Sequence, residues 1–257
     1  MIHPTAIVDP KAEIGGDVEI GPYSVIESDV SIGEGTRIGP HVIIREGTKM
    51  GKGCRVFQFA SIGEAPQFFG YKGEKTFLQI GDRNIIREFV TLHRGTVKGD
   101  GKTVIGNDNY LMAYSHIAHD CQVGNQVVMA NGATLGGHIL IEDHAIIGGL
   151  SAVHQFCRIG THAILSGITG VSQDVPPYMM AAGSRAKLYG LNSIGLKRHQ
   201  FSEQEIKALK KAYRIIFRSG LTLEKAIKAV KEDEIFQIPK VQHLLQFIQH
   251  SKRGITR

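Results

Sequence analysis

An aliphatic residue or methionine recurs at every sixth position over most of the chain. The first run has eleven members without a miss: Ile2, Val8, Ile14, Ile20, Ile26, Ile32, Ile38, Ile44, Met50, Val56 and Ile62. A second run, one residue out of phase, has twelve: Ile105, Leu111, Ile117, Val123, Met129, Leu135, Ile141, Ile147, Val153, Ile159, Leu165 and Val171. A period of six fits neither an α-helix nor a simple strand alternation, and it is typical of parallel β-helices. The repeat therefore predicts a β-solenoid in which each hexapeptide supplies one short strand and one corner.

Three hexapeptides are expected to form one triangular coil, so that every third repeat lies on the same wall. The aliphatic residue points inwards, and a glycine that directly follows it, such as Gly21 or Gly33, is expected to meet unusual backbone demands at the corner. Such coils bury a continuous core only by stacking on their neighbours. The repeat alone is thus equally compatible with a purely structural or binding solenoid.

Two interruptions and a change of pattern divide the chain. The segments at about 64–76 and 94–104 are rich in glycine and polar residues, and we predict that they are loops that protrude from the solenoid. Beyond residue 190 helix signals take over: Ser202 and Glu205 form a capping box, Thr222 can cap a second helix, and Pro239 can begin a third. We therefore expect a β-solenoid over residues 1–190 and a helical domain over residues 191–257.

The bulk composition argues against several classes of protein. No targeting segment or long apolar run is visible, so a soluble cytoplasmic protein without membrane insertion is expected. Cys54, Cys121 and Cys157 form no C-x-x-C pair and are expected to be buried thiols. The net charge of +6 favours an acidic partner. Nucleic acid is disfavoured, because the aromatic residues do not alternate with basic ones in any known module.

The repeat also places the histidines of the segment "AYSHIAHDCQVG". Positions three hexapeptides apart stack on one edge of the solenoid, about 4.8 Å apart per coil. One such step from His119 gives Gly137, which precedes His138, and a second step gives Gln155, which follows His154. His119, His138 and His154 are therefore predicted to line one edge on successive coils.

Two kinds of chemistry are open to this edge. Asp120 can orient His119 as a general base, and the backbone N–H of Gly137 can stabilise an oxyanion. The alternative is a zinc-dependent carbonic anhydrase, a reaction that some hexapeptide proteins perform with histidines about five residues apart. His116 and His119 are three apart, so we predict no metal.

Several segments carry a resemblance to a known family. "FASIGE", "IGDRNIIRE", "HRGT", "HIAHDC", "AIIGG", "AVHQFC", "QDVPPY" and "GLKR" occur in this order. The chain thereby resembles the UDP-N-acetylglucosamine acyltransferases of lipid A biosynthesis over nearly its whole length. The resemblance implies left-handed coils and transfer of a 3-hydroxyacyl chain from acyl carrier protein to the 3-position of UDP-N-acetylglucosamine. It also implies a homotrimer with active sites between subunits, and no cofactor beyond the carrier's own phosphopantetheine.

The same resemblance assigns roles to individual residues. It makes His119 the general base, Asp120 its orienting partner and the Gly137 N–H the oxyanion donor. Further matches line the substrate cleft, approach the nucleotide or form the floor of the acyl groove: Gln67, His93, His116, His138, His154, Gln155, Gly167, Asn192 and Arg198. Four positions depart from the family pattern: Phe68, Gly70, Arg185 and His199. Because the loop departures approach the sugar, a 3-amino analogue of the UDP-sugar stays open as an alternative acceptor.

Overall fold

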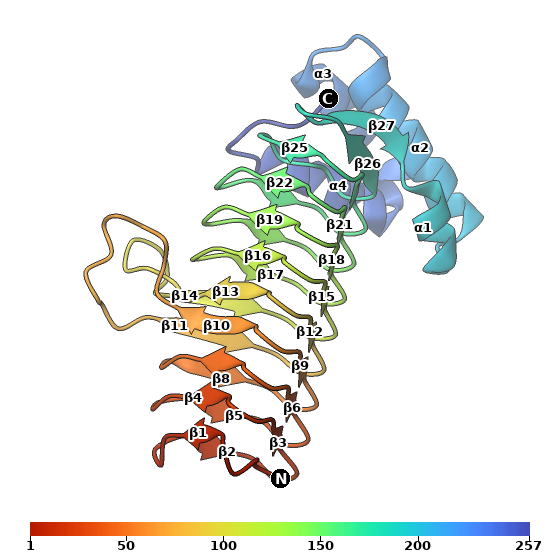
Figure 1. Cartoon of the computed structure of the whole chain (residues 1–257). Coiled ribbons are helices and arrows are strands. Elements are labelled where there is room, and N and C mark those ends of the chain that lie inside the picture. The colour runs from red at the N-terminus through yellow and green to blue at the C-terminus, as the bar shows by residue number, and fades with distance from the viewer.

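A computed structural model of the chain describes all 257 residues, which form a triangular β-helix followed by a helical C-terminal part (Figure 1). Short strands stack into three sheets of nine, eight and ten members. Val25 pairs with Ile43, and Ile43 pairs with Ser61, so the strands of the regular coils pair with the strand three repeats along the chain. The predicted β-helix of hexapeptide repeats with a helical C-terminal domain is confirmed.

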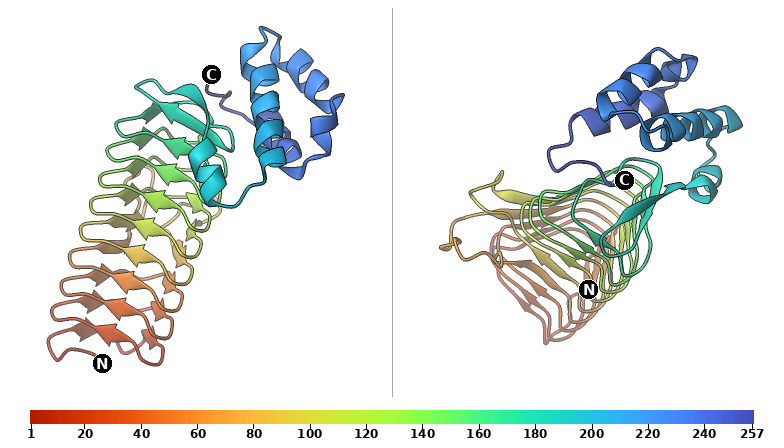
Figure 2. Two further views of the ribbon diagram at one scale, coloured as in Figure 1. Left: turned by 90° about the vertical axis from the view of Figure 1, so that its right-hand side faces the viewer. Right: turned by 90° about the horizontal axis from the view of Figure 1, so that it is seen from above.

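The three sheets form the three walls seen end-on in Figure 2. Sheet 1 contains β1 (Ile7–Val8), β4 (Val25–Ile26), β7 (Ile43–Ile44), β10 (Ser61–Glu64), β13 (Thr91–His93), β16 (His116–Ile117), β19 (Thr134–Leu135), β22 (Ala152–Val153) and β25 (Gly170–Val171). Sheet 2 contains β2 (Glu13–Ile14), β5 (Ser31–Ile32), β8 (Thr48–Met50), β11 (Phe77–Ile80), β14 (Lys102–Ile105), β17 (Gln122–Val123), β20 (Leu140–Ile141) and β23 (Arg158–Ile159). Sheet 3 contains β3 (Glu19–Ile20), β6 (Arg37–Ile38), β9 (Arg55–Val56), β12 (Ile85–Ile86), β15 (Tyr110–Leu111), β18 (Val128–Met129), β21 (Ile146–Ile147), β24 (Ile164–Leu165), β26 (Met179–Ala182) and β27 (Lys187–Leu191). We name each corner by the sheets it joins: corner 1–2, corner 2–3 and corner 3–1.

The corner glycines have a different role from the one expected. Gly21 and Gly33 have no positive φ; instead, a Cβ on Gly33 would lie 2.5 Å from the Gly51 carbonyl carbon of the next coil, and one on Gly21 would lie 2.7 Å from that of Gly39. The left-handed backbone conformation occurs two residues later, at Tyr23 (φ 59°) after Gly21 and at Gly35 (φ 69°) after Gly33. Close stacking of coils therefore selects Gly21 and Gly33, and the expectation based on dihedral angles was wrong for them. Gly63, which also follows an aliphatic residue, does adopt a positive φ of 78°.

Two long loops leave the β-helix at corner 1–2, where Figure 1 shows them projecting to one side. Ser61 of β10 pairs with Thr91 of β13, and Thr91 pairs with His116 of β16. Both steps along the chain are longer than those between regular coils, because residues 65–76 and 94–101 are inserted between strands. Both loops thus emerge at one corner, on adjacent coils.

Helices follow the last coil. They are α1 (Ser193–Arg198), α2 (Glu203–Arg218), α3 (Leu223–Lys231), the 3₁₀ helix η1 (Glu234–Gln237) and α4 (Pro239–Gln249). The capping box of Ser202 and Glu205 on α2 and the Thr222 cap on α3 are confirmed. The sequence did not predict α1 or the antiparallel pair β26 and β27, which lie where the six-residue period has ended. The chain then returns to the β-helix, where Ile255 bridges to Asp174.

The thiols are buried as expected. Cys54, Cys121 and Cys157 are free and buried, and burial raises the pKa of Cys121 to about 12. These thiols therefore stay protonated and are poor nucleophiles. No helix has the length and apolar character that crossing a bilayer requires.

Candidate active site

Three of the predicted side chains meet at corner 1–2. His119 Nδ1 lies 2.8 Å from Asp120 Oδ2, and His138 Nε2, one coil along, lies 3.6 Å from the same oxygen. The two imidazole rings meet edge to face with centroids 5.2 Å apart. Asp120 and His138 occupy the same left-handed corner position on successive coils, with φ of 60° and 59°. The regular repeat of the coils thus brings these side chains together.

The loop at residues 94–101 holds the Asp120 carboxylate in place. Thr96 donates its backbone N–H to Oδ1 (2.9 Å) and its hydroxyl to Oδ2 (2.6 Å). Burial alone would raise the pKa of the Asp120 carboxyl, but the hydrogen bonds with His119 and Thr96 outweigh burial and hold the pKa below its ordinary value. Asp120 is therefore an ionised acceptor at neutral pH. Sequence reasoning gave Thr96 no role, although it is the last residue of the "HRGT" segment.

Gly137 lies directly against the His119 ring. A Cβ built on Gly137 would be 2.6 Å from His119 Cε1 and 2.9 Å from Nε2, so only glycine leaves room for this imidazole. The Gly137 N–H has no acceptor within the chain. Gly137, whose backbone N–H is free, therefore packs against the ring that carries the nitrogen facing away from Asp120.

Two further histidines extend the site along sheet 1. His93, at the end of β13, and His116, on β16, meet edge to face with centroids 4.8 Å apart. The Thr91 hydroxyl lies 2.7 Å from His116 Nδ1, whereas the buried Nδ1 of His93 has no partner. Burial, and then the neighbouring His116, lower the pKa of His93 to about 4. Burial also lowers the pKa of His116 and of His138. These rings are therefore neutral at pH 7.

The buried His93 should make the protein sensitive to acid. In the unfolded chain it takes up a proton near pH 6.5, but in the folded protein only near pH 4, so stability falls as the pH drops through this window. Of the titratable groups around it, only Glu64 favours the protonated ring, whereas His116 and His119 oppose it when they are protonated. We expect a loss of up to about 3 kcal/mol from this residue. Urea unfolding of wild type and His93→Gln between pH 7 and 4 measures it, and parallel stability curves would contradict the assignment.

The loop at residues 65–76 places the aromatic ring of Phe68 next to His119. Phe68 meets the imidazole at a centroid distance of 5.7 Å, and Lys98 Nζ lies 5.0 Å from the Phe68 ring centroid on the side of the second loop. A Cβ on Gly70 would lie 2.6 Å from the Phe68 ring. The two departures from the family pattern are therefore coupled, because Phe68 takes up the space next to Gly70. Sequence reasoning could not place Phe68, since an inserted loop has no register with the coils.

The other predicted residues lie elsewhere in the single chain. His154 and Gln155 are exposed further along corner 1–2, where His154 contacts Arg253 (3.1 Å) and not His138. Gln67 is exposed on the first loop.

Gly167, Asn192 and Arg198 are on other corners. Gly167 lies on corner 3–1 after β24, and Asn192 lies near corner 2–3, where it caps α1 and donates to the His162 carbonyl oxygen (2.9 Å). Arg198 is the exposed last residue of α1. One chain alone does not bring these residues to His119.

Corner 1–2 offers both a hollow and possible metal ligands. A cavity of about 300 Å³ opens there, lined by Gly99, Asp100, Lys102, Asp120, Gln122, His138, Ile139 and Leu140. Ligand atoms of His119, Asp120 and His138 lie within 4.8 Å of one another and could hold a cation. Asp120 already accepts from Thr96 and lies against His119 Nδ1, which is the arrangement of an oriented base.

Comparisons with known proteins consistently match this chain to acyltransferases built on hexapeptide repeats. Residues 174–256 match the family model "Udp N-acetylglucosamine O-acyltransferase; Domain 2", and residues 102–137 match bacterial transferase hexapeptide repeats. The acyl-[acyl-carrier-protein]–UDP-N-acetylglucosamine O-acyltransferases of Janthinobacterium sp. and Thermodesulfovibrio yellowstonii are each 58% identical, over 100% of this chain and 99% of the relative.

Solved structures agree with the sequence relatives. The UDP-N-acetylglucosamine O-acyltransferase of Moraxella catarrhalis superposes with a TM-score of 0.96 at 47% identity, covering 100% of this chain and 99% of that one. The UDP-N-acetylglucosamine acyltransferase of Bacteroides fragilis superposes with a TM-score of 0.98 at 40% identity, covering 100% of both chains.

Proposed function

Because this chain belongs to the acyl-[acyl-carrier-protein]–UDP-N-acetylglucosamine O-acyltransferases of lipid A biosynthesis, we propose that His119 is the general base of the transfer. The donor is a 3-hydroxyacyl thioester on the phosphopantetheine of acyl carrier protein, and the acceptor is the 3-hydroxyl of UDP-N-acetylglucosamine. The observation that carries the proposal is the 2.8 Å contact of His119 Nδ1 with Asp120, beside the unpaired N–H of Gly137.

The contact with Asp120 fixes which nitrogen of His119 reacts. A carboxylate at Nδ1 favours the tautomer with the proton on Nδ1, so the lone pair is on Nε2. Nε2 takes the proton from the sugar hydroxyl as its oxygen attacks the thioester carbonyl carbon. Asp120 then stabilises the imidazolium, and the neutral rings of His93, His116 and His138 add no positive charge beside it.

Gly137 acts on the acyl donor, at the carbonyl oxygen of the thioester. As the carbonyl oxygen becomes an oxyanion, the free N–H of Gly137 donates to it. When the tetrahedral intermediate collapses, the carbon–sulfur bond breaks and the phosphopantetheine thiolate takes the proton back from His119 Nε2. The thioester is already activated, so the scheme needs no covalent enzyme intermediate.

The proposal includes a homotrimer with sites between subunits. Corner 3–1 carries a row of exposed apolar side chains, among them Tyr114, Leu150 and Ile168, which are 63%, 69% and 70% exposed in the single chain. An apolar row of this length favours burial against other subunits. A neighbouring subunit would also supply Asn192, Arg198 and Gly167, which lie on other corners than His119.

One observation favours the alternative acceptor with a 3-amino group. The Phe68 ring, 5.7 Å from the His119 ring, makes the surroundings of the base less polar. Such surroundings disfavour an ammonium ion and so keep an amine in its neutral, nucleophilic form. Acyl transfer to the analogue would then proceed at this site with the same residues.

A single assay tests the acceptor and the acyl-chain length. UDP-N-acetylglucosamine and its 3-amino analogue are each offered with 3-hydroxyacyl carrier proteins of increasing chain length. We expect kcat/KM to favour the 3-hydroxyl sugar, and a preference for the amine would establish the alternative instead. Absence of acyl transfer to either sugar would overturn the proposed function.

The same assay tests Gly167 as the floor of the acyl groove. Gly167 is exposed, and a Cβ there meets only the Gly149 carbonyl oxygen at 3.4 Å, so substitution is tolerated sterically. We expect Gly167→Met to lower kcat/KM for the longest accepted chain by about tenfold or more, with shorter chains preferred. Gly167→Ala, with a smaller side chain, serves as the graded control. An unchanged chain preference in both variants would exclude this role.

A further inference from the structure

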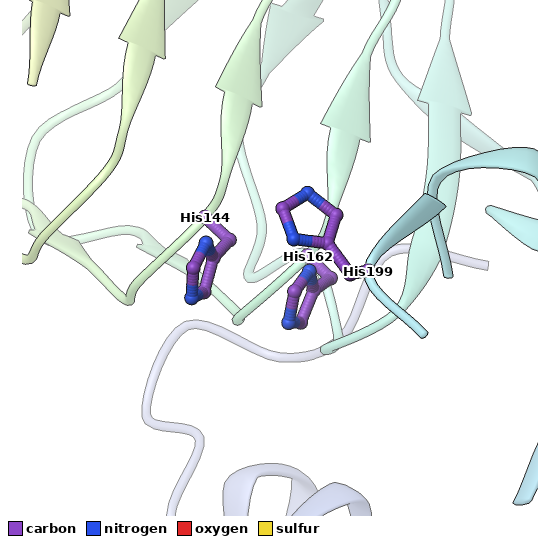
Figure 3. A group of neighbouring side chains, drawn as sticks. All are labelled: His144, His162 and His199. Carbon is purple, nitrogen blue, oxygen red and sulfur yellow. The ribbon is translucent and has the colours of Figure 1, made fainter. Parts of the chain in front are cut away.

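A second group of histidines lies at corner 2–3, on the other side of sheet 2 from the candidate active site. His144 and His162 hold the same corner position on successive coils, with φ of 60° and 54°, and their rings stack with centroids 4.5 Å apart at 4°. His199, the residue after α1, faces both rings edge-on at 4.9 and 4.7 Å (Figure 3). Ring nitrogens from all three residues lie within 4.8 Å of one another.

These three rings lack the hydrogen bonds that imidazoles usually make. Nδ1 of His144 is fully buried and has no partner, and no hydrogen bond joins the rings of His162 or the exposed His199 to the rest of the chain. By contrast, His116 contacts a threonine and His119 contacts an aspartate. A buried imidazole nitrogen without a partner is costly, and a bound ligand would remove that cost. His144 carries such a nitrogen, and its ring lies against two further imidazoles, so the three residues together supply the donor set of a metal site.

We infer that His144, His162 and His199 together bind a divalent transition-metal ion. Imidazole nitrogens suit Zn²⁺, Co²⁺, Ni²⁺ and Cu²⁺ and not the oxygen-seeking Mg²⁺ or Ca²⁺. Three histidines with a fourth position open to water form a common zinc arrangement. The ion would fasten the end of α1 to the corner of the β-helix.

The protonation states support binding at neutral pH. Burial, followed by the neighbouring histidines, lowers the pKa of His162 to about 4, and burial lowers that of His144 as well. Both rings therefore offer a free lone pair at pH 7. Lys240 of α4 opposes a cation here, whereas Asp143 favours one.

The site must tighten when the ion enters. Ligand nitrogens around a tetrahedral zinc with bonds of about 2.05 Å are about 3.3 Å apart. The ring nitrogens of the three histidines lie within 4.8 Å of one another, so they must come closer together to bind the ion. Parallel rings cannot both direct a lone pair at one ion, so His144 or His162 must rotate. His199 is exposed and follows the short helix α1, so it can move inwards from the solvent side.

The test is a metal titration of untagged, full-length protein that has been stripped with EDTA. Calorimetry with Zn²⁺ at pH 7.5 should show a site of one ion per chain at these residues. Because ligand-supporting residues alone change metal affinity by about 10–100-fold, His199→Ala and His144→Ala should each weaken binding at least about tenfold. The exposed His250, whose ring contacts a carbonyl oxygen of its own helix, gives the matched control His250→Ala.

Two further readouts separate the outcomes. His138→Ala should retain this site, because it changes only the group at corner 1–2. Zn²⁺ should raise the melting temperature of wild type but not of His199→Ala, since binding stabilises only the folded state. Equal titrations of wild type and His199→Ala, or loss of the only zinc site in His138→Ala, would overturn the inference. Acyl transfer plays no part in these measurements, so they do not depend on the proposed function.

Discussion

His119→Ala is expected to lower kcat for acyl transfer by about a hundredfold or more, because general bases typically contribute 10²–10⁴-fold. On the proposed mechanism, the variant keeps Asp120 and the Gly137 N–H but has no group to take the proton from the sugar hydroxyl. The imidazole is part of the surface of corner 1–2 and not of the hydrophobic core, so the fold should persist. Steady-state kinetics with 3-hydroxyacyl carrier protein and UDP-N-acetylglucosamine measure the loss.

Two controls make this result interpretable. His250→Ala removes an exposed imidazole from the end of α4 and should leave turnover unchanged. Sedimentation should give the mass of three chains for wild type and for His119→Ala alike. Turnover near the wild-type value in His119→Ala would exclude this residue as the base.

Gly137→Ala is expected to disable the same site without removing any functional group. The new methyl would lie 2.6 Å from Cε1 of His119, so the ring must move. A displacement of about 1 Å of a reacting group can lower the rate about a hundredfold. We therefore expect a large fall in kcat, measured in the same assay. Gly16→Ala is the matched control, because a Cβ there has no neighbour within 4 Å.

A double mutant shows whether the methyl acts through His119. If it does, His119→Ala with Gly137→Ala should be no slower than His119→Ala alone, since mutations that affect one unit are not additive. If the kcat loss of the double mutant equals the product of the two single losses, Gly137 acts independently of His119, for example through its own N–H. Normal turnover in Gly137→Ala would contradict the close packing described here.

The regular part of the fold was predictable because one repeat specifies it. Counting three hexapeptides to a coil brought His119, Gly137 and His138 together, as the structure has them. The same arithmetic links His144 to His162, a pair that the sequence analysis did not consider. It also places Gly167 on a different corner from His119, because the stretch between them is not a whole number of coils.

The irregular parts were not predictable in this way. Phe68 and Thr96 reach the site on inserted loops, whose residues have no register with the coils. Helix α1 and the pair β26 and β27 follow the end of the period, and their positions depend on tertiary packing. The corner positions of Gly21 and Gly33 were identified correctly, but the reason given for glycine there was wrong, because contact between neighbouring coils is invisible in a single hexapeptide.

The fixed pairing of the coil strands with the strands three repeats away limits how such a chain can change its length. Val25, Ile43 and Ser61 stay in line only because each coil between them has the same length. Gain or loss of a whole turn leaves every wall in phase, whereas gain or loss of a single hexapeptide within the stack would rotate all later residues by one third of a revolution. Evolution can therefore lengthen or shorten this enzyme only in full turns, or by letting extra residues bulge outwards at a corner, as they do twice beside Asp120.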